Sequence, residues 1–163
     1  ELGVPDADIA AGITDYVPVG RRASVIDTGC LTIVDDCYNA NPDSTQMAIL
    51  SAADLGGRLV CILGDMLELG VSSDMFHRAV GGYFAEAGVD CVIAVGGLAR
   101  YIAEGAQAGG VPQVFYFDAQ EKAHEAISKE LRAGTSILVK ASRAMSFEKL
   151  VQYIVDHTPE EKP

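Results

Sequence analysis

The densest group of polar residues in the chain lies at positions 35–46, where the sequence is DDCYNANPDSTQ. Asp36 could accept hydrogen bonds from the hydroxyls of a ribose, and the side-chain amides of Asn39 and Asn41 offer donors as well as acceptors. The like charges of Asp35 and Asp36 repel each other unless a cation or a hydrogen-bond donor lies close to them. The first half of this stretch therefore predicts a binding site for a polar ligand.

The second half of the same stretch has a simpler explanation in local backbone chemistry. Pro42 would make the turn rigid, and Asp43 or Ser44 could cap the helix that follows. We therefore expect these three residues to start a helix, not to contact a ligand.

Two carboxylates follow another apolar run, in the sequence LGDMLELG at 63–70. Asp65 comes directly after the run and Glu68 three residues later, and such a pair could orient an ammonium group or a Mg²⁺ ion. The alternative is a solvated loop, which suits Glu68 better than Asp65. His77 follows, and a single histidine is more often a structural residue than a base.

A group of hydrogen-bond donors follows the last apolar run of the chain. Lys140, Ser142 and Arg143 lie within four residues of one another, before an amphipathic segment. Such a group suits a carboxylate or a phosphate, because an arginine binds either in bidentate fashion and a helix N-terminus adds partial positive charge. The alternative is a cationic loop that balances the charge of an acidic protein.

Short β-rich runs alternate with amphipathic segments along most of the chain. The runs LVCIL and CVIAV are apolar at every position, which is typical of a parallel sheet covered by helices on both faces. We predict an α/β fold with a Rossmann-like, mostly parallel sheet and an N-terminal hairpin or edge strand. The expected strands are 23–27, 31–36, 58–64, 91–96, 113–117 and 136–140, and the expected helices are 44–56, 72–88, 98–107, 120–131 and 146–157.

The predicted sheet would bring the polar groups together, because ligands of open α/β sheets bind beyond the carboxyl ends of the strands. The three groups described above each follow a predicted strand. The alternative is that loops between strands and helices are polar in any protein.

Composition limits the kind of partner and the compartment. The 163 residues suffice for one domain, and the net charge of −11 argues against a nucleic acid or an anionic membrane as the main partner. The four cysteines have no metal-like spacing and indicate a reducing, cytoplasmic environment. No apolar run reaches about 18 residues, and we expect neither a signal peptide nor a membrane span. Since the chain does not begin with methionine, we expect it to be part of a longer protein.

Several catalytic motifs are missing from the sequence. It contains no GxxxxGK[ST] phosphate loop, no GxGxxG fingerprint, no GxSxG elbow and no HExxH motif. We therefore expect no catalytic residue and no metal site in this chain alone, and a domain that presents ligands to a site completed elsewhere.

Four stretches in order resemble the C-terminal domain of the Mur ligases. They are Gly20-Arg21, DDCYNANPDS, LGDMLELG with His77 after it, and VKASRAM, and the resemblance covers 8–157. Within that family the chain is most similar to the members that add D-alanyl-D-alanine to UDP-N-acetylmuramoyl-tripeptide in peptidoglycan biosynthesis.

The resemblance implies a three-domain, ATP-dependent amide ligase. ATP, with Mg²⁺ bound mainly by a central domain, would phosphorylate the tripeptide carboxylate, and the amine of D-alanyl-D-alanine would attack the acyl phosphate. Residues 1–20 would be the end of the central domain and a hinge, 21–157 the C-terminal domain, and 158–163 a polar tail. We expect a monomer that is inactive without the other domains.

The resemblance also assigns individual residues. It implies nucleotide contacts by Arg21, Asp36, Asn39 and Asn41, and substrate contacts by Asp65, Glu68, His77, Lys140, Ser142 and Arg143. The chain departs from the family at Ala141 and Ala144, where glycine is usual and where a Cβ atom could restrict φ, and at Cys37, where serine is common.

Two alternatives to this assignment remain open. One is another amide ligase of the Mur or folylpolyglutamate type that adds a different amino acid. The other is a stand-alone α/β ligand-binding module such as a receiver domain, although Asp35 and Asp36 follow a hairpin and so lie on the wrong strand for a receiver.

Overall fold

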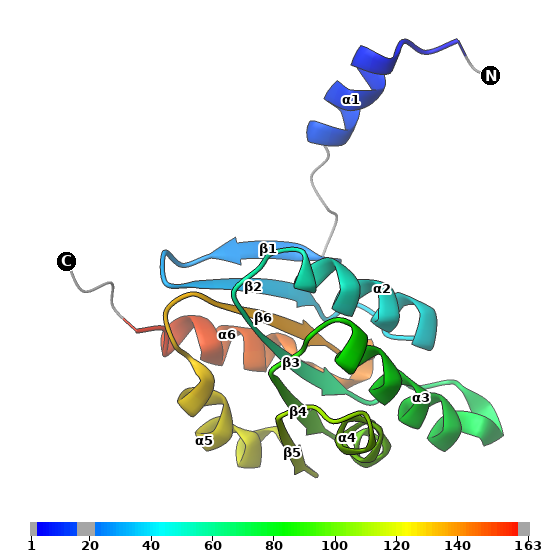
Figure 1. Cartoon of the computed structure of the whole chain (residues 1–163), viewed down its shortest axis with the longest axis vertical. Helices are drawn as coiled ribbons and strands as arrows, with labels where there is room; N and C mark the ends of the chain where they lie inside the picture. Colours follow the sequence, from blue (N-terminus) through cyan, green and yellow to red (C-terminus); the bar gives the residue numbers. More distant parts are fainter. Residues whose placement is uncertain (1–2, 16–21, 160–163) are drawn as a thin grey trace.

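The core of the protein is a six-stranded sheet with the order β1-β2-β6-β3-β4-β5 (Figure 1). The computed structural model describes residues 3–15 and 22–159. All neighbouring strands are parallel except β1 and β2, which form an antiparallel hairpin, so the predicted mostly parallel sheet with an N-terminal hairpin is confirmed. The strands are β1 (Ser24–Asp27), β2 (Leu31–Asp36), β3 (Arg58–Gly64), β4 (Cys91–Val95), β5 (Gln113–Phe117) and β6 (Thr135–Lys140).

Helices cover both faces of the sheet, and alternate residues of each strand separate the two cores. On β3, Cys61 and Leu63 pack with α2, α3 and α4, whereas Val60 and Ile62 pack with α5 and α6. This period of two is that of a strand buried on both sides. The helices are α2 (Pro42–Ala53), α3 (Ser73–Glu86), α4 (Ala99–Ala108), α5 (Gln120–Glu130) and α6 (Glu148–Asp156), with short 3₁₀ turns η1 (Gly70–Ser72) and η2 (Arg143–Met145).

The N-terminal segment contains helix α1 (Asp6–Thr14), which has no buried residue. Residues 1–20 were expected to be the end of a central domain and a hinge, and of these residues 1–2 and 16–20 lie outside the described part of the chain. Within the described part of the chain, no helix is both long and apolar enough to cross a membrane.

The chain order places a topological switch point at β6. This strand lies between β2 and β3, yet the helix that follows it covers the opposite face from the helices that follow its two neighbours. The loops after β2, β3 and β6 therefore diverge at the carboxyl edge of the sheet, where open α/β sheets bind their ligands.

The four thiols are free, and three of them lie in the core, where water does not reach them. Burial raises the pKa of Cys61, and burial together with the nearby Glu130 carboxylate raises the pKa of Cys91 to about 12. At pH 8 such a thiol is almost entirely in its unreactive, protonated form.

We therefore expect an aromatic disulfide reagent at pH 8 to modify Cys30, which is half-buried, before the other three thiols. Cys37, Cys61 and Cys91 should react only as fast as the chain unfolds, and urea should equalise all four rates. Rapid modification of a second thiol in the folded chain would contradict this burial.

Candidate functional site

The loop after β2 is tied to β6 by a buried ion pair. Asp36 and Lys140 are neighbours in the register of the two parallel strands, and their side chains form an ion pair. Lys140 Nζ also donates to the carbonyl oxygen of Asn39, at 2.9 Å. The Lys140 side chain is only 2% exposed, so its ammonium group is enclosed by these partners and is not open to a ligand.

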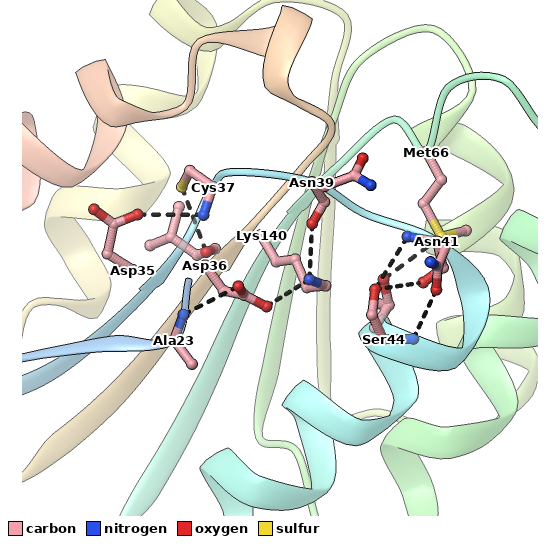
Figure 2. A network of polar contacts seen from close by, with 11 residues as sticks. Ala23, Asp35, Asp36, Cys37, Asn39, Asn41, Ser44, Met66 and Lys140 are labelled. Carbon is pink, nitrogen blue, oxygen red and sulfur yellow. Dashed lines mark hydrogen bonds and ion pairs between the residues drawn. The ribbon is translucent and has the colours of Figure 1, made fainter. Parts of the chain in front are cut away.

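The repulsion expected between the two neighbouring acids is avoided by the alternation of the strand. Asp36 faces Lys140, while Asp35 lies on the other side of β2, where its Oδ1 accepts the N–H of Cys37 at 3.3 Å (Figure 2). Asp36 Oδ1 accepts the N–H of Ala23 at 3.1 Å. Both oxygens of Asp36, the predicted ribose acceptor, thus already have protein partners.

Asn41 caps helix α2, which corrects the expected helix start. Its Oδ1 accepts the N–H of Ser44 at 2.8 Å, and the Ser44 hydroxyl accepts the N–H of Asn41, so the two residues form a capping box. The prediction that Asp43 or Ser44 is the cap and that the helix starts at 44 was wrong, because Pro42 takes the first helical position. Asn41 itself is exposed.

Asp65 caps the start of helix α4 across the sheet. Its Oδ1 accepts the N–H groups of Leu98 and Ala99 at 2.9 and 2.7 Å, and its Oδ2 accepts the N–H of Gly97 at 3.1 Å. The first N–H groups of a helix have no partner within the helix, and a carboxylate there also interacts favourably with the helix dipole. Asp65, which is 8% exposed, therefore has a structural role that outweighs the solvated-loop alternative.

Two side chains, His77 and Ser142, accept hydrogen bonds from the backbone of the loop after β3. His77 is fully buried, and its Nε2 accepts the N–H of Met66 at 2.9 Å while Nδ1–H donates to the carbonyl of Ser73. Ser142 Oγ accepts the N–H of Leu67 at 2.8 Å. The Ser142 N–H donates to the carbonyl of Asp65. These contacts fix the position of the loop, and neither side chain faces solvent.

The outer rim of this edge consists of exposed side chains. Glu68 is exposed with a left-handed φ of 65°, which a residue with a Cβ atom rarely adopts. The Arg143 side chain is 62% exposed. Its Nη1 forms an ion pair with Oε2 of Glu148 at 3.8 Å, which is too far for a hydrogen bond. The side-chain amide of Asn39 is exposed and points away from Lys140 (Figure 2).

The predicted site residues thus form two layers. The structure brings them to one edge, but Asp36, Asp65, His77, Lys140 and Ser142 build the layer beneath the surface, and Asn39, Asn41, Glu68 and Arg143 form the rim. Arg21 lies outside the described residues.

The departures from the family pattern are accommodated by packing. Ala141 and Ala144 have no positive φ, and the Ala141 methyl is buried where a Cβ on Gly64 would lie 2.7 Å from it. A small residue at 64 thus makes room for the larger one at 141. Cys37 is buried, with its Sγ 3.5 Å from the carbonyl of Val139.

Two rim features escaped the prediction from sequence. The guanidinium of Arg22 lies 4.1 Å from the centre of the exposed Tyr38 ring, and Ala23 has a φ of 50°. The only sequence signal at Tyr38 is an aromatic residue between polar ones, and no sequence signal marks Ala23.

Metal ligands do not cluster at this edge. Among residues 3–15 and 22–159, no group of three histidine, cysteine, aspartate or glutamate side chains is arranged to hold an ion.

Comparisons with known proteins identify relatives for nearly the whole chain. The family model for "Mur ligase, glutamate ligase domain" matches residues 21–143. A UDP-N-acetylmuramoyl-tripeptide–D-alanyl-D-alanine ligase of Bacillus subtilis is 33% identical over 95% of this chain and 35% of its own length. The Escherichia coli protein of the same description is 35% identical over 91% and 32%.

Solved structures agree with the sequence relatives. A crystal structure of MurF from Acinetobacter baumannii superposes with a TM-score of 0.82 and 30% identity, over 95% of this chain and 35% of that one. The chain therefore spans about a third of the length of the proteins that it matches.

Proposed function

Because this chain belongs to the Mur ligase family, as its glutamate ligase or C-terminal domain, we propose that it presents the amine substrate of an ATP-dependent peptide ligase. The reaction would add D-alanyl-D-alanine to UDP-N-acetylmuramoyl-tripeptide, in the cytoplasm, during peptidoglycan biosynthesis. The B. subtilis and E. coli relatives are D-alanyl-D-alanine ligases, which favours this amine over glutamate.

The observation that carries the proposal is the pair of opposite charges on two connected loops. Leu67 and Ser142 are hydrogen-bonded at 2.8 Å, and the exposed carboxylate and guanidinium belong to the next residue of each loop, Glu68 and Arg143. A dipeptide carries an amino group at one end and a carboxylate at the other. Glu68 would hold the amino end, and Arg143 would hold the carboxylate in bidentate fashion.

The nucleotide would lie on the neighbouring part of the rim. The exposed amides of Asn39 and Asn41 offer donors to phosphate oxygens, and Arg21 would join them. A Mg²⁺ ion would take its ligands from the ATP phosphates and from the other domains of a longer ligase.

The chemical role of this domain would be positioning. ATP transfers its γ-phosphoryl group to the tripeptide carboxylate, the dipeptide nitrogen attacks the acyl carbon, and the amide forms as phosphate leaves and the nitrogen loses a proton. Glu68 and Arg143 would hold the nitrogen near that carbon, which lowers the entropic part of the barrier. The hydrogen bonds of the buried side chains of Asp65, His77 and Ser142 would keep the two loops in fixed positions.

A chimera tests the proposal. This chain would replace the matched segment of the B. subtilis ligase, and phosphate release would be measured with tripeptide precursor, ATP and either D-alanyl-D-alanine or glutamate. We expect release that depends on the dipeptide. Arg143→Gln and Glu68→Gln should each raise the KM for the dipeptide at least about tenfold, because each removes a charged hydrogen bond.

The isolated chain is the control, and we expect no ATP-dependent ligation from it. Turnover by the isolated chain would refute the division of labour between domains. A chimera that uses glutamate instead of the dipeptide would favour the other type of amide ligase.

A further inference from the structure

The carboxylate of Asp36 lies at the centre of a relay that joins three distant segments. Its Oδ2 is paired with Lys140, its Oδ1 accepts the N–H of Ala23 at 3.1 Å, and Lys140 Nζ in turn donates to the carbonyl of Asn39 at 2.9 Å (Figure 2). The relay therefore connects the first residues before β1 with the rim loop after β2.

The segment before β1 has a backbone conformation that needs this support. Ala23 has a φ of 50°, which a residue with a Cβ atom rarely adopts, and it is exposed, so no packing holds it there. The preceding residue, Arg22, stacks on Tyr38, two residues beyond Asp36. Two contacts thus hold residues 22 and 23 next to the same rim loop.

We propose that Asp36 is a positioning residue that couples the backbone of Ala23 to the rim loop 37–41. While Asp36 accepts the N–H of Ala23, residues 22–23 stay turned toward the loop. A donor that competes for the carboxylate, such as the hydroxyls of a ribose, would release Ala23 to an ordinary negative φ. The coupling rests on contacts within this chain, and its use by a nucleotide rests on the proposed function.

Lys140 transmits the coupling, because it contacts Asp36 and the Asn39 carbonyl from β6, whereas Ala23 precedes β1. If Lys140 lost its ammonium group, the Asp36 side chain would lose the partner that orients it. A substitution at Lys140 should then affect the backbone of Ala23 through Asp36, which contacts both residues.

Amide hydrogen exchange in the isotope-labelled chain tests the coupling without any ligand. Because Ala23 is exposed, its protection depends on Asp36. We expect Asp36→Ala to speed exchange at Ala23 about tenfold and Lys140→Met to speed it about fivefold. Asp36→Asn, which keeps an acceptor oxygen, should rescue part of the protection. The amides of Ile62 and Val92 report global unfolding and correct for any loss of stability.

Asp27→Ala is the matched control, since Asp27 also accepts a backbone N–H in the hairpin, that of Gly29 at 2.8 Å. It should change exchange at Ala23 less than twofold. Unchanged exchange at Ala23 in Lys140→Met would overturn the coupling, whatever reaction the protein serves.

The chimera supplies the functional half of the test. Lys140→Met should raise the KM for ATP about tenfold and that for the dipeptide less than twofold, which a general loss of stability would not do. A larger effect on the dipeptide would place Lys140 in the amine site and refute its role in the relay. An inactive chimera would refute the proposed function, and the exchange experiment would still decide the coupling.

Discussion

Gly81→Ala should destabilise the folded chain by about 3 kcal/mol, more than most single substitutions. Gly81 lies on α3 where this helix crosses α4, and a Cβ atom at Gly81 would overlap the backbone of Gly105. A Cβ at Gly105 would in turn overlap the carbonyl oxygen of Arg78. Because backbone atoms cannot move aside as a side chain can, the two helices would have to separate and lose contacts along their whole interface.

Thermal and urea unfolding measure this effect, and the adjacent glycine supplies the control. Gly82 is exposed on the same helix, and a Cβ there meets no atom within 4 Å. Gly82→Ala should therefore stabilise the chain by up to about 1 kcal/mol, because alanine loses less backbone entropy in a helix. If both substitutions had the same sign, close contact of the helices would not be the cause.

The sequence predicts the central elements well because their signal is local. The expected and observed limits of β3 and β5 agree, and both strands are bounded by residues that disfavour strands. The last helix differs, since a helix was expected from 146 whereas η2 and a left-handed Ser146 precede α6, which starts at Glu148. That turn depends on contacts with other segments, such as the hydrogen bond from Gln120 to the Met145 carbonyl, which no local pattern contains.

The location of the site was also predictable, but the structural roles of its residues were not. The strand ends follow from the pattern of strands and helices, and the polar residues gather there as expected. Whether a carboxylate is free depends on which backbone N–H groups lie within reach. Asp65 accepts hydrogen bonds from the N–H groups of Gly97, Leu98 and Ala99, some thirty residues away in the sequence. Glu68 has no hydrogen-bond partner within the described part of the chain. Types and spacing of residues do not contain that information.

Asp65→Ala should destabilise the chain by about 3 kcal/mol, because three backbone N–H groups at the start of α4 would lose a charged acceptor in a place that water reaches poorly. Asp65→Asn should fall between the wild type and Asp65→Ala, since its single carbonyl oxygen still accepts part of the set. Urea unfolding followed by circular dichroism gives the free energies, and the amides of Leu98 and Ala99 should lose protection from exchange before the core does.

Glu68→Gly separates folding from function in the same loop. Glycine adopts a φ of 65° without strain, so the chain should become more stable by up to about 1 kcal/mol, although it loses the carboxylate. In the chimera the same variant should lose affinity for the dipeptide at least as strongly as Glu68→Gln. A stabilised variant with unchanged KM would mean that the left-handed glutamate is strained for a reason other than the amine. A destabilised one would mean that the loop needs the carboxylate to fold, as it needs Asp65.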